Sequence, residues 1–224
     1  MRPSEFRALP VTLPPHDGEG LLGLPARPAR GIVLFAHGSG SSRLSPRNAF
    51  VAEALQRAGM ATLLFDLLTE QEAANRANVF DIPLLADRLD QAATWVSTSA
   101  AGRNQPLGFF GASTGAAAAL VAAAGRQDVR AIVSRGGRPD LAGDVLETVT
   151  APTLLIVGGH DPEVFALNRS AYRHLRCECR LEVVPGATHL FEESGTLESV
   201  VALARAWFLQ HLDREAEEAG RDVS

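Results

Sequence analysis

The chain has 224 residues, of which 46% are hydrophobic and 21% charged, a composition typical of a globular protein that buries one good-sized core. The formal net charge of −5 argues against nucleic acid and against an anionic membrane surface as partners, because both need a basic face. All 21 basic residues are arginines, which excludes Schiff-base chemistry, a Ser-Lys dyad and a phosphate-loop lysine.

The sequence indicates neither a targeting segment nor a metal site. The N-terminal segment has no apolar run long enough for a signal-peptide core, and no later run approaches the length of a transmembrane helix, so we expect a cytoplasmic protein. Cys177 and Cys179 are too close in sequence for an ordinary disulfide, and a lone C-x-C motif supplies two ligands where a structural zinc site needs four. We therefore expect two reduced thiols, no metal and no cofactor.

Short apolar runs alternate with amphipathic stretches along most of the chain. Residues 1–30 contain two strand-like runs joined by "HDGEG", which predicts an antiparallel hairpin at a sheet edge. The later runs are apolar at successive positions, as in parallel strands covered on both faces. These runs span residues 31–37, 61–66, 107–111, 131–134, 153–159 and 180–184.

The segments between these runs carry apolar residues at helical spacing. We therefore predict an α/β fold: a doubly wound, mostly parallel sheet of about seven to eight strands with helices on both faces. Residues 1–212 are expected to form a single domain, and the charged tail over 213–224 is expected to fray.

Three polar residues follow the ends of predicted strands, where open α/β sheets gather their functional groups. Ser113 lies in "GASTG", which matches the nucleophile elbow G-x-S-x-G between a predicted strand and a predicted helix. His189 is our candidate base and Asp161 our candidate acid, since a serine hydroxyl needs a base that a carboxylate orients. Three alternatives remain open. Ser113 could form an ordinary turn, Asp161 could cap a helix, and Asp140 could be the acid in place of Asp161.

The blocks "HGSGSS", "GASTG", "GGHDPEV" and "GATHLF" resemble those of α/β-hydrolases, in particular the dienelactone hydrolase-like branch, over residues 30–212. The resemblance implies Ser113 as nucleophile, Asp161 as acid and His189 as base. It also implies an oxyanion hole formed by the backbone N–H groups of Thr114 and Ser39. Dienelactone hydrolases themselves use cysteine as the nucleophile, so the serine of this chain places a dienelactone substrate in doubt.

The Gly-rich loop and the ends of several strands carry further polar residues. His37 begins that loop and is expected to brace it. We hypothesise that Arg135, together with Arg43, selects an anionic acyl compound, with a loop-bracing ion pair as the alternative. Asp66 and Glu70 follow a strand end and receive no role. Many α/β-hydrolases insert a cap domain at the position of "RGGRPDLAGDVLETVTA", and this stretch is too short to form one.

These observations predict a serine hydrolase that cleaves a small carboxylic ester, lactone or thioester without a metal, through an acyl-enzyme. Its expected partner is a small acyl substrate, and the sequence leaves open whether the protein is a monomer or a homodimer. Two alternatives remain: an acyltransferase that uses the same acyl-enzyme, and a non-catalytic module that binds a small ligand or a partner.

Overall fold

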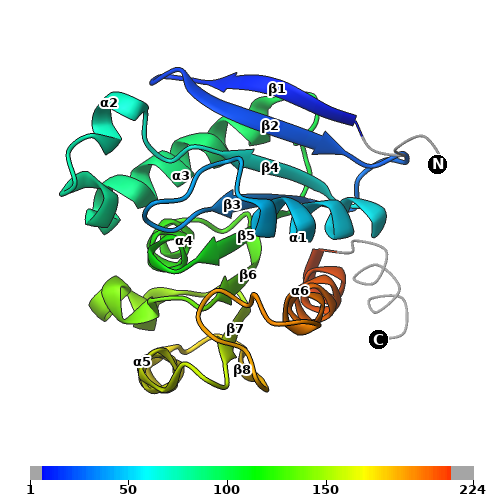
Figure 1. The fold of residues 1–224 in the computed structure, drawn as a ribbon. Coiled ribbons are helices and arrows are strands. Elements are labelled where there is room, and N and C mark those ends of the chain that lie inside the picture. Colours follow the sequence, from blue (N-terminus) through cyan, green and yellow to red (C-terminus); the bar gives the residue numbers. More distant parts are fainter. Residues whose placement is uncertain (1–6, 213–224) are drawn as a thin grey trace.

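The computed structural model describes residues 7–212, so the tail expected over 213–224 lies outside the described residues. Its centre is an eight-stranded sheet in the order β1-β2-β4-β3-β5-β6-β7-β8 (Figure 1). The strands are β1 (Arg7–Leu13), β2 (Gly18–Leu24), β3 (Ile32–Ala36), β4 (Ala61–Phe65), β5 (Leu107–Ala112), β6 (Val129–Arg135), β7 (Thr153–Gly158) and β8 (Cys179–Val184).

Six of the eight strands, β3 to β8, run parallel to one another. The other two form an antiparallel hairpin that pairs through β2 with β4, at one edge of the sheet. The predicted α/β class with a mostly parallel sheet is therefore confirmed.

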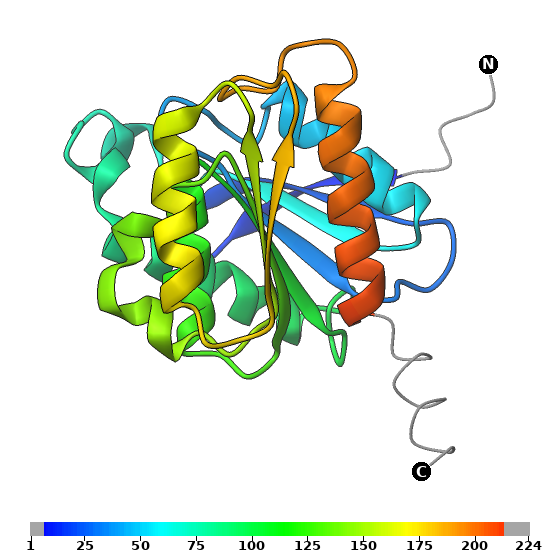
Figure 2. The ribbon, with the colours of Figure 1, turned by 90° about the horizontal axis from the view of Figure 1, so that it is seen from below.

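Helices cover both faces of this sheet, as the sequence predicted. On one face α1 packs against α6, and on the other α3, α4, η2 and α5 lie side by side. Figure 2 shows α5 and α6 on opposite sides of the strands. The helices are α1 (Pro46–Arg57), α2 (Glu70–Ala73), α3 (Ile82–Thr98), α4 (Thr114–Ala124), α5 (Pro162–His174) and α6 (Thr196–Leu212), with 3₁₀ segments η1 (Asn78–Phe80) and η2 (Pro139–Thr148).

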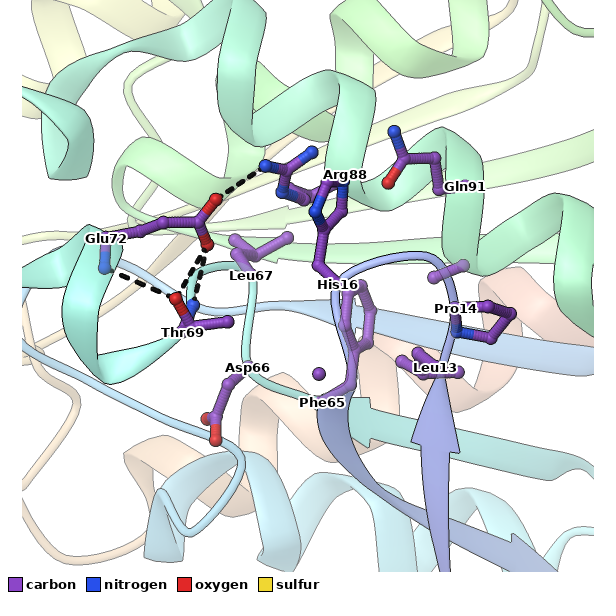
Figure 3. A pocket seen from close by; sticks show the side chains of 12 residues that line it. Leu13, Pro14, His16, Phe65, Asp66, Leu67, Thr69, Glu72, Arg88 and Gln91 are labelled. Carbon is purple, nitrogen blue, oxygen red and sulfur yellow. Dashed lines mark hydrogen bonds and ion pairs between the residues drawn. The ribbon is translucent and has the colours of Figure 1, made fainter.

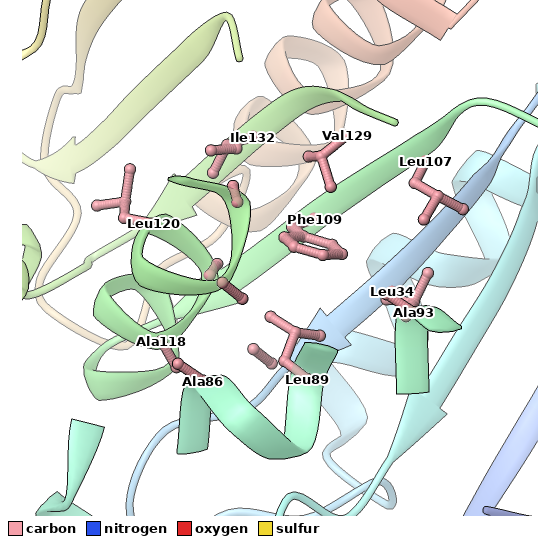
Figure 4. Packing of buried hydrophobic residues seen from close by; sticks show 14 of the residues in the cluster. Leu34, Ala86, Leu89, Ala93, Leu107, Phe109, Ala118, Leu120, Val129 and Ile132 are labelled. Carbon is pink, nitrogen blue, oxygen red and sulfur yellow. The ribbon is translucent and has the colours of Figure 1, made fainter. Parts of the chain in front are cut away.

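The two covered faces explain why the strands are apolar at successive positions. In β3, Ile32 and Leu34 belong to the core under α3 and α4, whereas Val33 and Phe35 belong to the core under α1 and α6. Figure 4 shows the first of these cores around Phe109. Because neighbouring side chains of a strand point to opposite faces, each parallel strand supplies both cores.

The connection between β6 and β7 contains η2 and no cap domain, in agreement with the prediction. Among residues 7–212, none of the helices is both long enough and apolar enough to cross a membrane.

Candidate active site

The turn between β5 and α4 holds Ser113 in a strained backbone conformation. Its φ is 51° and its ψ is −123°, a region that residues with side chains rarely adopt. Two glycines of the motif make this turn possible: a Cβ on Gly111 would lie 2.4 Å from the Cα of Ala116, and a Cβ on Gly115 would lie 2.2 Å from the carbonyl oxygen of Ala36. The G-x-S-x-G spacing is therefore a steric requirement of this turn.

The hydroxyl of Ser113 is not used to cap the helix that follows. Ser113 occupies the N-cap position of α4 but makes no side-chain capping hydrogen bond. Its carbonyl oxygen accepts from the N–H of Arg138 at 3.0 Å, which fixes the backbone of the turn. The side chain is thus half-buried and presented at the carboxyl edge of the sheet.

A second pair of residues meets at the same edge of the sheet. The Nδ1–H of His189 donates to Oδ2 of Asp161 at 2.8 Å, which leaves Nε2 as the ring nitrogen free to act as a base. The other oxygen of Asp161 accepts from the N–H of Val164 at 3.4 Å, so this residue also caps α5. The rival acid, Asp140, forms an ion pair with Arg138 instead.

The loop that carries His189 packs closely on the ends of β6 and β7. A Cβ on Gly136, the residue after β6, would lie 3.0 Å from the carbonyl oxygen of His189, and one on Gly158 would lie 2.4 Å from that of Ala187. The N–H of His160 also donates to the carbonyl of Ala187 at 2.9 Å. These contacts hold the imidazole at the strand ends next to the Ser113 turn.

The Gly-rich loop after β3 approaches the same turn from the other side. A Cβ on Gly38 would lie 2.9 Å from the Cβ of Ser113, and the N–H of Ser39 donates to the Oγ1 of Thr114 at 3.1 Å. Thr114 is the first residue of α4, so its own N–H is one of the four without an intrahelical acceptor. The N–H of Ser39 is therefore engaged by the Thr114 side chain in this structure, and the oxyanion hole stays a prediction.

His37 braces this loop, as the sequence indicated. Its Nε2 accepts from the N–H of Leu67 at 3.1 Å, and its Nδ1–H donates to the carbonyl of Gly38 at 3.0 Å. Burial lowers the pKa of His37 below its ordinary value of 6.5, so the ring is neutral at pH 7. A neutral ring is what both hydrogen bonds require.

The two arginines proposed for an anionic substrate occupy different environments. Arg43 forms ion pairs with Asp66 and Glu19, so its charge is compensated by loop-bracing contacts. Arg135 was expected after a strand end, but the structure makes it the last residue of β6, where it is buried beside Asn48. The two arginines therefore have different partners, and their joint selection of an anionic acyl compound stays a prediction.

A cavity of about 730 Å³ opens beside the Gly-rich loop. Its walls are residues 37–44, residues 66–70 and Leu85 of α3. Asp66 and Glu70, which received no role from the sequence, both line it. The cavity thus offers room for a small molecule beside Ser39, but neither Ser113 nor His189 is among its lining residues.

A second cavity lies beneath residues 66–69 and holds about 20 Å³, roughly the space of one water molecule (Figure 3). On its rim Arg88 donates to Glu72 at 2.6 Å, and Glu72 accepts from the N–H of Thr69 at 2.9 Å. These bonds attach the start of α2 to α3 and keep the cavity wall in place.

The cysteines lie away from these groups. Burial raises the pKa of the Cys177 thiol, and it raises the pKa of Cys179 to about 12. Both are therefore protonated and unreactive at neutral pH. Within residues 7–212, His, Cys, Asp and Glu side chains form no group of three or more that could hold a metal ion.

Comparison with known proteins agrees with this architecture. The model of the alpha/beta hydrolase domain matches residues 29–202. The chain belongs to the alpha/beta hydrolase family. The solved structure of a dienelactone hydrolase from Anabaena variabilis is 52% identical, with a TM-score of 0.87 over 92% of this chain and 97% of that one. This alpha/beta hydrolase is therefore of the dienelactone hydrolase-like branch.

More distant structures show the fold alone. The esterase domain of a Rhodothermus marinus protein has a TM-score of 0.73 at 19% identity, over 92% of this chain and 99% of that domain. It extends the likeness in fold to proteins with little sequence in common.

A longer relative comes from Mycobacterium tuberculosis strain H37Rv and is provisionally named a phosphoribosyl transferase. It is 62% identical over 203 residues, which make up 90% of this chain and 46% of the relative. The alpha/beta hydrolase chain thus spans about half the length of this relative.

Three features of the site were missed by reasoning from the sequence. Arg47 and Asn48 of α1 lie next to Arg135, and the hydroxyl of Thr114 engages Ser39. The sequence contained one indication that Arg47 is unusual, because the positive charge of an arginine in the first turn of a helix is unfavourable to the helix dipole. The other two contacts join residues far apart in sequence and had no local signal.

Proposed function

We propose that this alpha/beta hydrolase is a serine hydrolase that cleaves a small carboxylic ester, lactone or thioester. The observation that carries the proposal is the 2.8 Å hydrogen bond from His189 Nδ1 to Asp161 Oδ2, at the strand ends that also present the uncapped hydroxyl of Ser113. A hydroxyl, an oriented imidazole and a carboxylate that orients it are the groups that acyl transfer requires.

The proposed roles follow from the hydrogen bonds. His189 takes the proton of the Ser113 hydroxyl at Nε2, while the Ser113 oxygen attacks the carbonyl carbon of the substrate. Asp161 holds the ring in the tautomer that accepts this proton and stabilises the imidazolium. His189 then returns the proton to the leaving alcohol or thiol, and a water molecule activated by His189 hydrolyses the acyl-enzyme.

The negative oxygen of the tetrahedral intermediate would be stabilised by the N–H groups of Thr114 and Ser39. In the structure the N–H of Ser39 donates to the Thr114 hydroxyl, so this hydrogen bond would be exchanged for one to the oxyanion, at the start of α4 where the helix dipole favours negative charge. Each such donor is typically worth on the order of 10²–10³ in rate. The substrate would extend from this point into the cavity of about 730 Å³ beside the loop.

We assign the transferase name of the mycobacterial relative to the part of that protein that this chain does not match. The matched part has the alpha/beta hydrolase fold, and its proposed triad performs acyl transfer. Phosphoribosyl transfer is therefore not proposed for this chain.

The experiment that tests the proposal is pre-steady-state hydrolysis of p-nitrophenyl acetate with and without an added alcohol. We expect a burst of one p-nitrophenol per Ser113, followed by slower turnover to acetate. Transfer of most of the acetyl group to the alcohol would favour the acyltransferase alternative. Folded protein that shows neither burst nor turnover would favour the non-catalytic binding module.

A further inference from the structure

The guanidinium of Arg135 is buried without a carboxylate partner. The residue is 8% exposed, and its Nε and Nη1 are enclosed with no hydrogen-bond acceptor. Its Nη2 reaches Oδ1 of Asn48 only at 3.4 Å. Burial lowers the pKa of Arg135 to about 10, so the group remains a cation at neutral pH. An uncompensated buried charge is costly to a folded protein.

A second cation lies beside it. Arg47 contributes to the lowered pKa of Arg135 through charge repulsion. Its side chain is 33% exposed and pairs with Glu192 at 2.8 Å, yet its Nε is enclosed and has no acceptor. Arg47 therefore combines an exposed ion pair with an enclosed N–H group.

The first turn of α1 adds positive charge at the same place. Arg47 and Asn48 belong to this turn, which contains no acidic residue. Helix N-termini carry a partial positive charge and normally attract acidic groups. Of these positive groups, Arg47 is paired with a carboxylate, that of Glu192, which is 61% exposed, whereas Arg135 contacts Asn48.

We propose that Arg135, Arg47 and the first turn of α1 form a binding site for a phosphate group. A phosphate supplies three strong acceptor oxygens with a charge of about −1.5 to −2 at pH 7, and to reach the enclosed N–H groups of both arginines, which lack acceptors, it would have to displace the side chains that cover them. A carboxylate supplies one unit of charge, which is less than the site leaves uncompensated.

The position of this site connects it to the proposed active site. The carbonyl of Arg135 accepts from the N–H of Ser113 at 3.4 Å, and the next residue, Gly136, lies under the loop of His189. Glu192 lies on that same loop. A phosphate group carried by the substrate would therefore lie close to the nucleophile. This extension to substrate choice rests on the proposed hydrolase function, whereas phosphate binding does not.

Titration calorimetry with inorganic phosphate tests the site directly. We expect the full chain with Ser113→Ala to bind phosphate, and Arg135→Met in that background to bind at least tenfold more weakly. Arg47→Met should also weaken binding, and it keeps the test valid if Arg135→Met does not fold. Arg126→Met is the matched control, because Arg126 is a mostly buried arginine that pairs with Asp90 and Asp128.

The proposal is overturned if phosphate does not bind, if Arg135→Met and Arg47→Met bind it as tightly as their parent, or if acetate binds equally well. Thermal unfolding gives a second readout: phosphate should raise the Tm of the parent but not that of Arg135→Met. Without phosphate, Arg135→Met should not lower the Tm, because it removes an unpaired buried charge. A clear drop there would show that the guanidinium has a structural partner.

Two esters that differ only in a phosphate group on the acyl part distinguish a phosphate carried by the substrate from free phosphate. A preference of at least tenfold in kcat/KM for the phosphorylated ester, lost in Arg135→Met, would identify a substrate phosphate. Equal rates combined with phosphate binding would identify free phosphate as the ligand. If neither ester is cleaved while phosphate still binds, the proposed hydrolase function fails and the phosphate site stands.

Discussion

At the scale of single residues, the site depends on which carboxylate orients His189. Two aspartates follow neighbouring strands, but Asp161 is 2.8 Å from Nδ1 of His189 whereas Asp140 is paired with Arg138. Residue type could not separate them, since both are aspartates beside a proline near a strand end. The loop geometry that brings His189 to Asp161 decides between the two.

Asp161→Asn should therefore abolish most of the proposed activity. The amide cannot stabilise the imidazolium and favours the wrong tautomer of His189, so we expect kcat to fall on the order of 10³–10⁴-fold. Asp140→Asn removes the same charge from an ion pair outside the triad and should change kcat less than about threefold. Equal losses of ester hydrolysis in the two variants would contradict the assignment of the acid.

His37 should make the stability of the protein depend on pH. Its pKa in the folded state is lowered from 6.5, and burial is the main cause. The unfolded chain therefore takes up a proton that the folded state resists, so the free energy of unfolding should fall as the pH falls below about 6.5. Below the folded-state pKa no further loss from this group is expected.

Urea unfolding between pH 7.5 and pH 5 measures this effect. His37→Gln should remove part of the pH dependence. Burial also lowers the pKa of His211, so His211→Gln should remove a separate part, and the two contributions should add because the residues lie in different elements. An unchanged pH dependence in His37→Gln would show that the buried ring does not resist protonation.

At the scale of elements, close packing of strand and helix sets the position of Ser113. Gly115 is the residue that lets α4 pass over β3, since a Cβ there would lie 2.2 Å from the carbonyl oxygen of Ala36. Gly115→Ala should cost about 2–3 kcal/mol in free energy of unfolding. Gly125→Ala, at the C-terminus of the same helix, places its Cβ in open space and should change it by less than about 0.5 kcal/mol.

Chemical denaturation of both alanine variants checks this prediction. If the two glycines tolerate alanine equally well, the close approach of α4 to β3 is not the reason for the motif.

The order of the elements was predictable because buried parallel strands leave a direct signal. Runs such as 153–159 are apolar at successive positions, and the glycines and polar residues that end them mark the edge where Ser113 and His189 lie. One run was predicted too short: β6 extends from Val129 to Arg135. The two arginines of β6 made its boundaries hard to predict, because a charged residue is not typical of a buried strand.

The contacts across the site were less predictable. The environment of Arg135 depends on Asn48 of α1, which precedes it by 87 residues, and Arg47 is paired with Glu192, 145 residues further along the chain. Local patterns carry no information about such pairs. The sequence gives candidate residues for the site, but their partners follow only from the packing of helices on the sheet.

At the scale of the whole molecule, one sheet is shared by two cores on its opposite faces. The chain has two tryptophans, and each reports on a different core: Trp95 of α3 packs against one and Trp207 of α6 belongs to the other. Because every parallel strand contributes to both cores, residues 7–212 should unfold as one cooperative unit.

Variants with one tryptophan, Trp95→Phe and Trp207→Phe, test this expectation by fluorescence. Each should give a single urea transition whose midpoint coincides with that of its own far-UV circular dichroism. Separate fluorescence and dichroism midpoints within one variant would show that the faces unfold independently, which contradicts a single domain.

We propose that the fold brings Ser113, Asp161 and His189 together at one edge of the sheet as a catalytic triad. The measurement that tests this most directly is the intact mass of the protein after treatment with a fluorophosphonate. The account predicts one adduct on the wild type, none on Ser113→Ala, and labelling at least 100-fold slower on His189→Ala. Folded wild-type protein without an adduct, or with an adduct that persists in Ser113→Ala, would show that Ser113 is not an activated nucleophile.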